Sequence, residues 1–205
     1  MNELIVEKQK ENIRYGQGTL VIILINLIVF VALNIFPSLG EKILLSHELS
    51  LILEKPWTLV TVIFSHEIFI HLILNMSLFF FFGSRLEKIT NTKTVWIVYL
   101  ISGLMGSITF LFTGLIIERG GFIAGASSAV LGVASAFSVL RPDTVILKSK
   151  AKWWVLSLIV FSIFPIFIIP QTLDSGVAHI TGILVGLISG YFLKRNEKTI
   201  NSLHD

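Results

Sequence analysis

Six long apolar segments, each free of Asp, Glu, Lys and Arg, recur along the chain. They cover Thr19–Phe36, Ile68–Ser84, Thr94–Ile117, Gly120–Leu140, Trp153–Leu173 and Ser175–Leu193. Their lengths of 17 to 24 residues suit helices that cross a bilayer, which need about 17–25 residues. The strands of a membrane barrel would be about half as long and would alternate in polarity, and that pattern is missing. The sequence therefore predicts an all-α membrane protein with six transmembrane helices.

Lysine and arginine residues are distributed unevenly between the loops. Thirteen lie in the two tails and in the loops after the second and fourth spans, whereas the opposite side has only Lys42, Lys55 and Arg119. Cytoplasmic loops carry the positive excess, so both termini are expected in the cytoplasm. We expect cytoplasmic tails at 1–17 and 195–205 and a membrane domain at 18–194. Usage rich in Lys, Ile and Asn favours a bacterial plasma membrane.

The segment between the first two spans, Leu39–Trp57, is rich in Leu and Ile but too charged to span. We interpret it as an external amphipathic segment that lies in the membrane interface. His47 within it, like His204 in the C-terminal tail, is expected to be solvated. The first span is longer than the apolar part of a signal peptide and no A-x-A-like site follows it, so we expect it to be retained.

Composition agrees with a membrane protein and narrows the chemistry. Hydrophobic residues make up 54% and charged residues 14% of the 205 positions, whereas soluble domains have about 25% charged residues. Cysteine is absent, which excludes disulfides, thiolate metal sites and cysteine nucleophiles. The net charge of +3 follows the membrane topology, so it does not indicate a nucleic-acid partner.

Four polar residues share one level of the predicted bundle. His71, Asn75, Ser127 and His179 each lie near the start of a span that runs from outside to inside. At about 1.5 Å per residue they lie roughly 5–12 Å below the outer surface. Polar groups inside a membrane are costly and indicate function. Asn26 and Asn34 in the first span have no catalytic-type residues near them in the sequence, and we interpret them as interhelical hydrogen-bonding groups.

The four residues suit nucleophilic catalysis. His71 and Asn75 lie four apart on one helix face and could direct two donors at one oxyanion. Ser127 follows a glycine-rich segment near a helix N-terminus, and a hydroxyl nucleophile needs a base such as His179. The spans contain no acidic residue, so the residues permit a Ser–His dyad without a third member.

Small residues predict which helices meet. Gly182 and Gly186 belong to a four-residue repeat of small residues in the sixth span, a pattern that allows close helix contact. The fourth span has small residues on two opposite sides, so we expect it at the centre of the bundle. The outer ends of these two spans, with Ser127 and His179, are then expected to meet.

Three segments together resemble the motifs of rhomboid intramembrane serine proteases. They are His71-Leu-Ile-Leu-Asn75-Met76, Gly125-Ala-Ser127-Ser128-Ala129, and Ala178-His179-Ile-Thr-Gly182 followed by Gly186. The resemblance implies a six-helix rhomboid-like bundle with an external interfacial loop between helices 1 and 2. It implies that Ser127 is the nucleophile and His179 the base. It also implies an oxyanion site made by His71, Asn75 and the Ser127 N–H, with support from the motif glycines Gly125, Gly182 and Gly186.

The resemblance further implies substrates that are transmembrane segments of other proteins. The fifth span would flank their entry, Pro170–Gly176 would form a loop over the site, and no cofactor, metal or obligate partner would be needed. Ser128, Leu131 and Thr58 stand where many members have Gly, an aromatic residue and Arg. Two alternatives stay open: a non-catalytic relative that binds transmembrane helices, and a small transporter.

Overall fold

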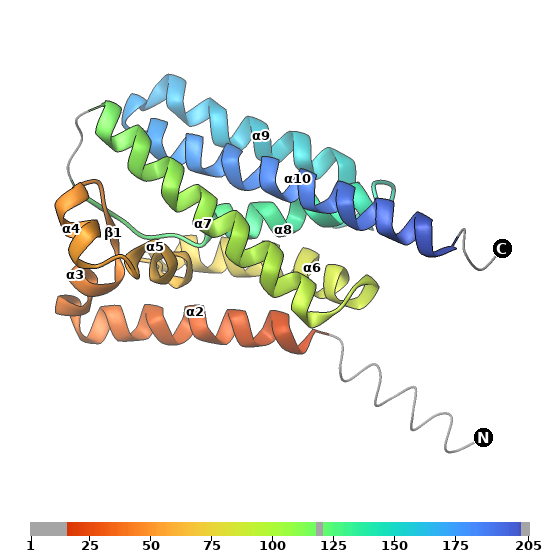
Figure 1. The fold of residues 1–205 in the computed structure, drawn as a ribbon, viewed down its shortest axis with the longest axis horizontal. Coiled ribbons are helices and arrows are strands. Elements are labelled where there is room, and N and C mark those ends of the chain that lie inside the picture. The colour runs from red at the N-terminus through yellow and green to blue at the C-terminus, as the bar shows by residue number, and fades with distance from the viewer. Residues whose placement is uncertain (1–15, 118–120, 202–205) are drawn as a thin grey trace, which may run out of the picture.

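The computed structural model describes residues 16–117 and 121–201, and these residues form a helical bundle (Figure 1). The main helices are α2 (Gln17–Ile35), α6 (Phe69–Ile89), α7 (Thr92–Ile116), α8 (Ser127–Leu140), α9 (Ala151–Ile168) and α10 (Leu173–Asn201). Five of them are long and apolar enough to cross a membrane, whereas α8 is apolar but has only 14 residues. The chain is therefore an all-α, multi-pass membrane protein.

Short elements connect the main helices. They are η1 (Pro37–Leu39), α3 (Gly40–Ile43), β1 (Leu45–Ser46), α4 (Leu49–Glu54), α5 (Thr58–Thr61), η2 (Val62–Phe64), β2 (Phe122–Ile123), β3 (Val145–Ile146), β4 (Ser149–Lys150) and η3 (Pro170–Thr172). The elements from η1 to η2 gather at one end of the bundle, beside the end of α2 (Figure 1). They occupy the position that the sequence assigns to the external interfacial segment.

The fourth apolar segment begins its helix later than the sequence predicts. We expected a span over 120–140, but the described residues 121–126 are not helical, and α8 starts at Ser127. One cause is local, because Gly121 and Gly125 adopt positive φ angles of 111° and 157°. The other is long-range, because β2 pairs antiparallel with β1. A chain that is extended at this point cannot also form intrahelical hydrogen bonds.

Helix α8 lies at the centre of the bundle, as the small residues predict. It packs against α6, α7, α9 and α10, and 12 of its 14 residues are buried. A Cβ added to Gly186 would overlap the backbone of Gly132, and one added to Gly182 would overlap the backbone of Ser128. Because these glycines have no side chains, α8 and α10 approach backbone to backbone.

Side-chain hydrogen bonds hold the interfacial segment together and join its C-terminal end to the bundle. Trp57 Nε1 donates to the carbonyl of Lys42 at 2.9 Å, and Tyr99 Oη on α7 donates to the carbonyl of Ile63 at 2.7 Å. The Tyr99 hydroxyl also accepts from Asn26 of α2 at 3.2 Å. Asn26 is thus an interhelical group, as predicted. The same prediction is wrong for Asn34, which donates to Phe30 in its own helix and is exposed.

The last third of the chain differs from the predicted boundaries. Helix α9 ends at Ile168, and the segment that we expected to be a loop, Pro170–Gly176, contains η3 and the first turn of α10. Pro165 lies in the last turn of α9, and the missing amide of Pro170 prevents the helix from continuing through it. The final helix then runs to Asn201, eight residues past the predicted end of its span.

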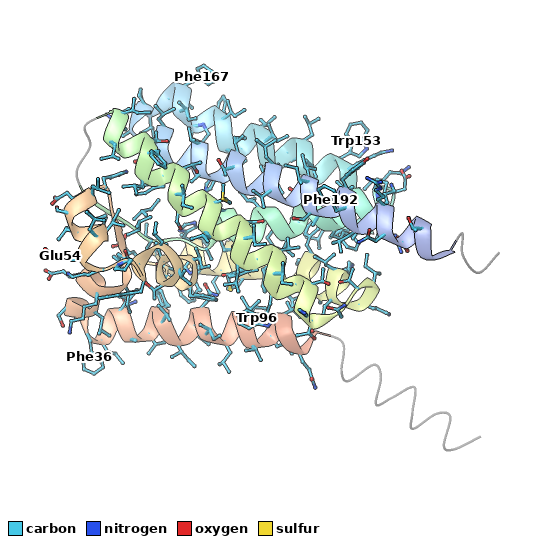
Figure 2. All side chains as sticks on the ribbon, in the orientation of Figure 1. Phe36, Glu54, Trp96, Trp153, Phe167 and Phe192 are labelled. Atoms are coloured by element: carbon cyan, nitrogen blue, oxygen red, sulfur yellow. The ribbon has the colours of Figure 1, made fainter. Side chains whose placement is uncertain are left out.

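Helix α9 is the most loosely covered helix of the bundle. Only Ala151, Leu158 and Ser162 among its residues are buried. Figure 2 shows Trp153 and Phe167 at its two ends projecting away from the other helices. This helix therefore presents a mostly apolar surface to the lipid.

Candidate active site

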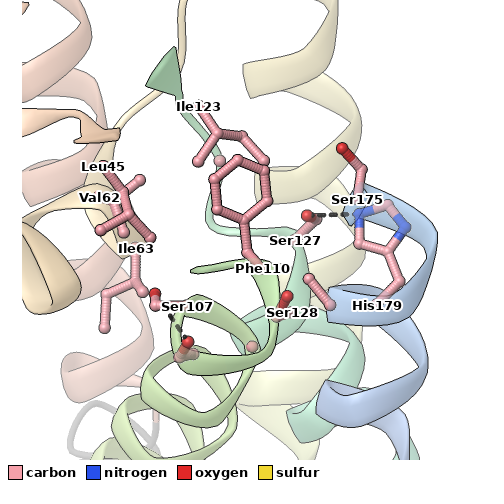
Figure 3. Close-up of a pocket in the computed structure, with 14 residues that line it drawn as sticks. Leu45, Val62, Ile63, Ser107, Phe110, Ile123, Ser127, Ser128, Ser175 and His179 are labelled. Carbon is pink, nitrogen blue, oxygen red and sulfur yellow. Dashed lines mark hydrogen bonds between the residues drawn. The ribbon is translucent and has the colours of Figure 1, made fainter. Parts of the chain in front are cut away.

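Ser127 and His179 lie in direct contact although 52 residues separate them. His179 Nε2 is 2.7 Å from Ser127 Oγ (Figure 3). This distance falls within the range of about 2.6–3.2 Å for a nucleophile and its base. The two residues therefore have the geometry of the Ser–His dyad that the sequence predicts.

The local chain positions Ser127 at the N-terminus of α8. Gly125 has a φ of 157°, which side-chain-bearing residues rarely adopt, and Ala126 serves as N-cap of the helix. Ser127 is the first helical residue, so its N–H has no partner within the helix. The positive end of the helix dipole lies at the same point. This end of α8 therefore suits an oxyanion that forms on a group bonded to Ser127.

The adjacent hydroxyl, Ser128, faces a different helix. A Cβ added to Gly106 of α7 would overlap both Cβ and Oγ of Ser128, so this serine packs against α7. His179 instead contacts Ser127. Of the two neighbouring serines, only Ser127 has the geometry of a nucleophile.

His71 and Asn75 lie on α6, as the motif requires, but their surroundings differ. A Cβ added to Gly125 would lie 3.4 Å from Cε1 of His71 and 3.6 Å from Oγ of Ser127, so Gly125 lies between the two side chains. Asn75 is 7% exposed, and its Nδ2 donates to the carbonyl of His71 at 3.0 Å. The structure thus brings His71 to the dyad and turns the Asn75 amide toward its own helix.

A small cavity adjoins the dyad. Ser127, Ser128 and His179 line it together with Ser107, Phe110 and Ser175 (Figure 3). Its volume of about 30 Å³ for the centre of a water-sized sphere exceeds the 10–15 Å³ that a water molecule requires. The hydroxyls of its wall supply the polar partners that a water needs. The cavity can therefore hold water beside Ser127.

His66 lies next to this group of residues and is fully buried. Its ring meets the ring of His71 edge-on at 5.3 Å between centroids. Burial, with a smaller contribution from His71, lowers the pKa of His66 to about 4. His66 is therefore uncharged at neutral pH, and its ring packs between the segment before α6 and His71.

His47 and Asp174 lie in contact, which the sequence did not predict. We expected His47 to be solvated, but it is 5% exposed, and its Nε2 lies 3.3 Å from Oδ2 of Asp174 in the first turn of α10. Asp174 falls between two predicted spans and was assigned to neither. The pair Leu44–Leu45, two residues before His47, was the available signal, because it indicates a segment that packs inward. His204, the other histidine expected to be solvated, lies outside the described residues.

The model of the rhomboid domain matches residues 53–196, which include all three motifs. The chain belongs to the rhomboid family. The matched range contains α6, α8 and α10, the helices that carry His71, Ser127 and His179.

Individual rhomboid relatives agree with this assignment. RHOMBOID-like protein 6, mitochondrial, of Arabidopsis thaliana is 35% identical over 68% of this chain and 44% of its own length. RHOMBOID-like protein 5 of the same plant is 32% identical over 67% of this chain and 44% of its own length. The putative rhomboid protease YdcA of Bacillus subtilis is 28% identical over 69% of both chains. The matches to the two plant proteins thus cover less than half of their length.

Proposed function

We propose that this rhomboid protein is an intramembrane serine endopeptidase that cleaves transmembrane segments of other proteins. The observation that supports this best is the 2.7 Å contact between Ser127 Oγ and His179 Nε2 at the N-terminus of α8. A helix-binding relative without catalysis would not need a hydroxyl and an imidazole in hydrogen-bond reach.

The proposed reaction follows acyl transfer through Ser127. His179 Nε2 takes the proton from Ser127 Oγ as this oxygen attacks the scissile carbonyl. The tetrahedral intermediate collapses to an ester on Ser127, and His179 gives the proton to the departing amine. A water then attacks the ester with His179 as base. The new carboxylic acid leaves, and the Ser127 hydroxyl is restored.

The surroundings of Ser127 suit the charge that develops in this reaction. The N–H of Ser127 and the positive end of α8 stabilise a negative oxygen, and His71 lies across Gly125 from the hydroxyl. Asn75 reaches the same point only if its amide turns away from the carbonyl of His71. We propose that substrate binding brings about this rotation.

Substrates would reach the dyad from the lipid. Helix α9 has few buried side chains, so it can move away from the bundle at a smaller cost than the other helices. A hollow on its lipid face is lined by Leu156, Val160, Phe161 and Phe164, which are apolar like the surface of a transmembrane helix. We propose that the substrate helix docks along α9 and that the water comes from the cavity beside Ser127.

We propose a bacterial plasma membrane as the location, on the basis of composition and loop charge. Both termini would face the cytoplasm, with residues 18–194 as the membrane domain and 1–17 and 195–205 as tails. The Arg141 guanidinium at the predicted cytoplasmic end of α8 pairs with Glu197 of α10 at 2.6 Å, and this pairing raises the pKa of Arg141 further. Such a permanent charge suits the headgroup level of the inner leaflet.

Cleavage of a transmembrane substrate in liposomes tests the proposal. We expect the wild type and Ser128→Ala to cleave, and Ser127→Ala and His179→Ala to lose cleavage. A fluorophosphonate probe should label the wild type and Ser128→Ala only. Cleavage by Ser127→Ala at the wild-type rate would contradict the assignment. A folded wild type that neither cleaves nor reacts with the probe would instead support a helix-binding relative.

A further inference from the structure

His47 and Asp174 form a buried contact that the dyad does not use. Nε2 of His47 lies 3.3 Å from Oδ2 of Asp174, and the two side chains are 4% and 5% exposed. The contact joins the interfacial segment after α2 to the first turn of α10, two elements that are far apart in sequence. Ionisable side chains in a membrane protein interior are costly and are seldom present without a role.

The His47 end of this contact is joined to the chain that leads to Ser127. The His47 N–H donates to the carbonyl of Gly121 at 3.3 Å, which continues the pairing of β1 with β2. From Gly121 the chain runs through β2 to Gly125 and Ser127 without another helix. The position of His47 is therefore coupled to the position of the Ser127 hydroxyl.

The Asp174 end is joined to the helix that carries His179. Asp174 lies in the first turn of α10, and its Oδ1 accepts from the N–H of Ser175 at 2.7 Å. A carboxylate at a helix N-terminus is also stabilised by the helix dipole. His179 follows five residues later on the same helix, about 7.5 Å along the axis. A shift of Asp174 therefore moves the base.

The surroundings of His47 hold its ring firmly. It stacks on Phe110 of α7 with 4.0 Å between ring centroids. A Cβ added to Gly114, one turn further on, would overlap the ring. Phe110 also lines the cavity beside Ser127 and His179. The ring has no room to move without shifting the wall of that cavity.

From these contacts we propose that His47 and Asp174 are positioning residues, which hold the segment before Ser127 and the helix of His179 at the distance that the reaction requires. This inference rests on the proposed proteolytic function. A buried contact between polar side chains contributes little net stability compared with apolar residues of the same size. Its effect here is to fix geometry. Neither side chain contacts Ser127 or His179 in the contacts described above, so the action is indirect.

The test compares variants of the pair with a matched buried carboxylate elsewhere. Glu87 of α6 is 2% exposed and accepts from Gly18, Thr19 and Thr92. It lies 16 residues from His71, about 24 Å along the helix. Asp174→Asn and Glu87→Gln each replace a buried carboxylate by its amide. His47→Leu removes the imidazole that contacts Asp174, and His47→Gln keeps a polar group near the position of Nε2.

The readouts are the rate of fluorophosphonate labelling per folded molecule and the kcat and KM for a transmembrane substrate. We expect Asp174→Asn and His47→Leu to lower the labelling rate and kcat by roughly tenfold to 100-fold, because misplacement by about 1 Å can cost this much. KM should stay within about twofold, since the pair does not touch the substrate. His47→Gln should recover most of the rate. The double variant His47→Leu/Asp174→Asn should be no slower than the slower single variant.

The control separates positioning from stability. Glu87→Gln should lower the unfolding temperature while the labelling rate of the folded fraction stays at the wild-type level. The proposal is overturned if Asp174→Asn and His47→Leu label at the wild-type rate once folded, or if their effects multiply in the double variant. An inactive wild type would instead refute the proposed function.

Discussion

Gly182→Ala should separate the two helices that carry the dyad. A methyl group at this position would lie 2.8 Å from the Ser128 Cα, whereas ordinary contact begins near 3.4 Å, and the Ser128 carbonyl oxygen is closer still. Helix α10 must then move from α8 by more than 0.6 Å. Because His179 lies one turn before Gly182, the Ser127–His179 distance of 2.7 Å should grow past 3.2 Å, the limit for efficient proton transfer.

The expected magnitudes follow from this shift. Overpacking should lower the free energy of unfolding by about 1–3 kcal/mol. The loss of alignment should lower the rate of fluorophosphonate labelling by roughly tenfold to 100-fold. Labelling of the folded fraction is measured in detergent, together with thermal unfolding of the same samples. The probe is small, so the result does not depend on how a substrate helix enters.

Gly190→Ala provides a matched control. A methyl group there would lie 2.7 Å from the carbonyl oxygen of Ala136, but two turns further from the dyad. We expect a similar loss of stability and a much smaller loss of labelling rate. Labelling of Gly182→Ala at the wild-type rate would refute this prediction, and so would an equal loss of rate per folded molecule in Gly190→Ala.

Two further predictions concern stability. The pKa of His66 is lowered from its usual value of 6.5 to about 4, so unfolded chains bind a proton between these pH values and folded chains do not. The contribution of neutral His66 to the free energy of unfolding is therefore complete above pH 6.5. As the pH falls toward 4, the free energy of unfolding drops by up to about 3 kcal/mol. Unfolding of His66→Gln should be less sensitive to pH over this range, and an unchanged slope would contradict the burial argument. Asn91 caps α7 by accepting from the Thr94 N–H at 2.9 Å, so Asn91→Ala should lower the free energy of unfolding by about 1 kcal/mol. Labelling of the folded Asn91→Ala variant should stay at the wild-type rate, and an unchanged unfolding temperature would show that the cap contributes nothing.

The sequence by itself determined the helical class and the residues that meet at the dyad. The bilayer imposes a minimum length on apolar helices, so long segments without charged residues predict the membrane helices directly. Polar residues at equal depth in three such segments also predict a shared site, since each must find a partner away from lipid. For this reason Ser127 and His179 could be paired before any fold was known. Gly182 and Gly186 indicated which helices touch, because small residues four apart on one helix face let another helix approach closely.

Only the tertiary structure decided the features that depend on contacts between distant segments. The late start of α8 required β1 to pair with β2, and a pattern of hydrophobicity does not encode that pairing. The burial of His47 required Asp174 to reach it from 127 residues away. A sequence that places His47 in a charged segment predicts a solvated side chain, because it does not show that Asp174 lies beside it. The Asn75 amide is a different case, because it donates to the carbonyl of His71 one turn earlier in its own helix, a local contact that a pattern of hydrophobicity does not encode either.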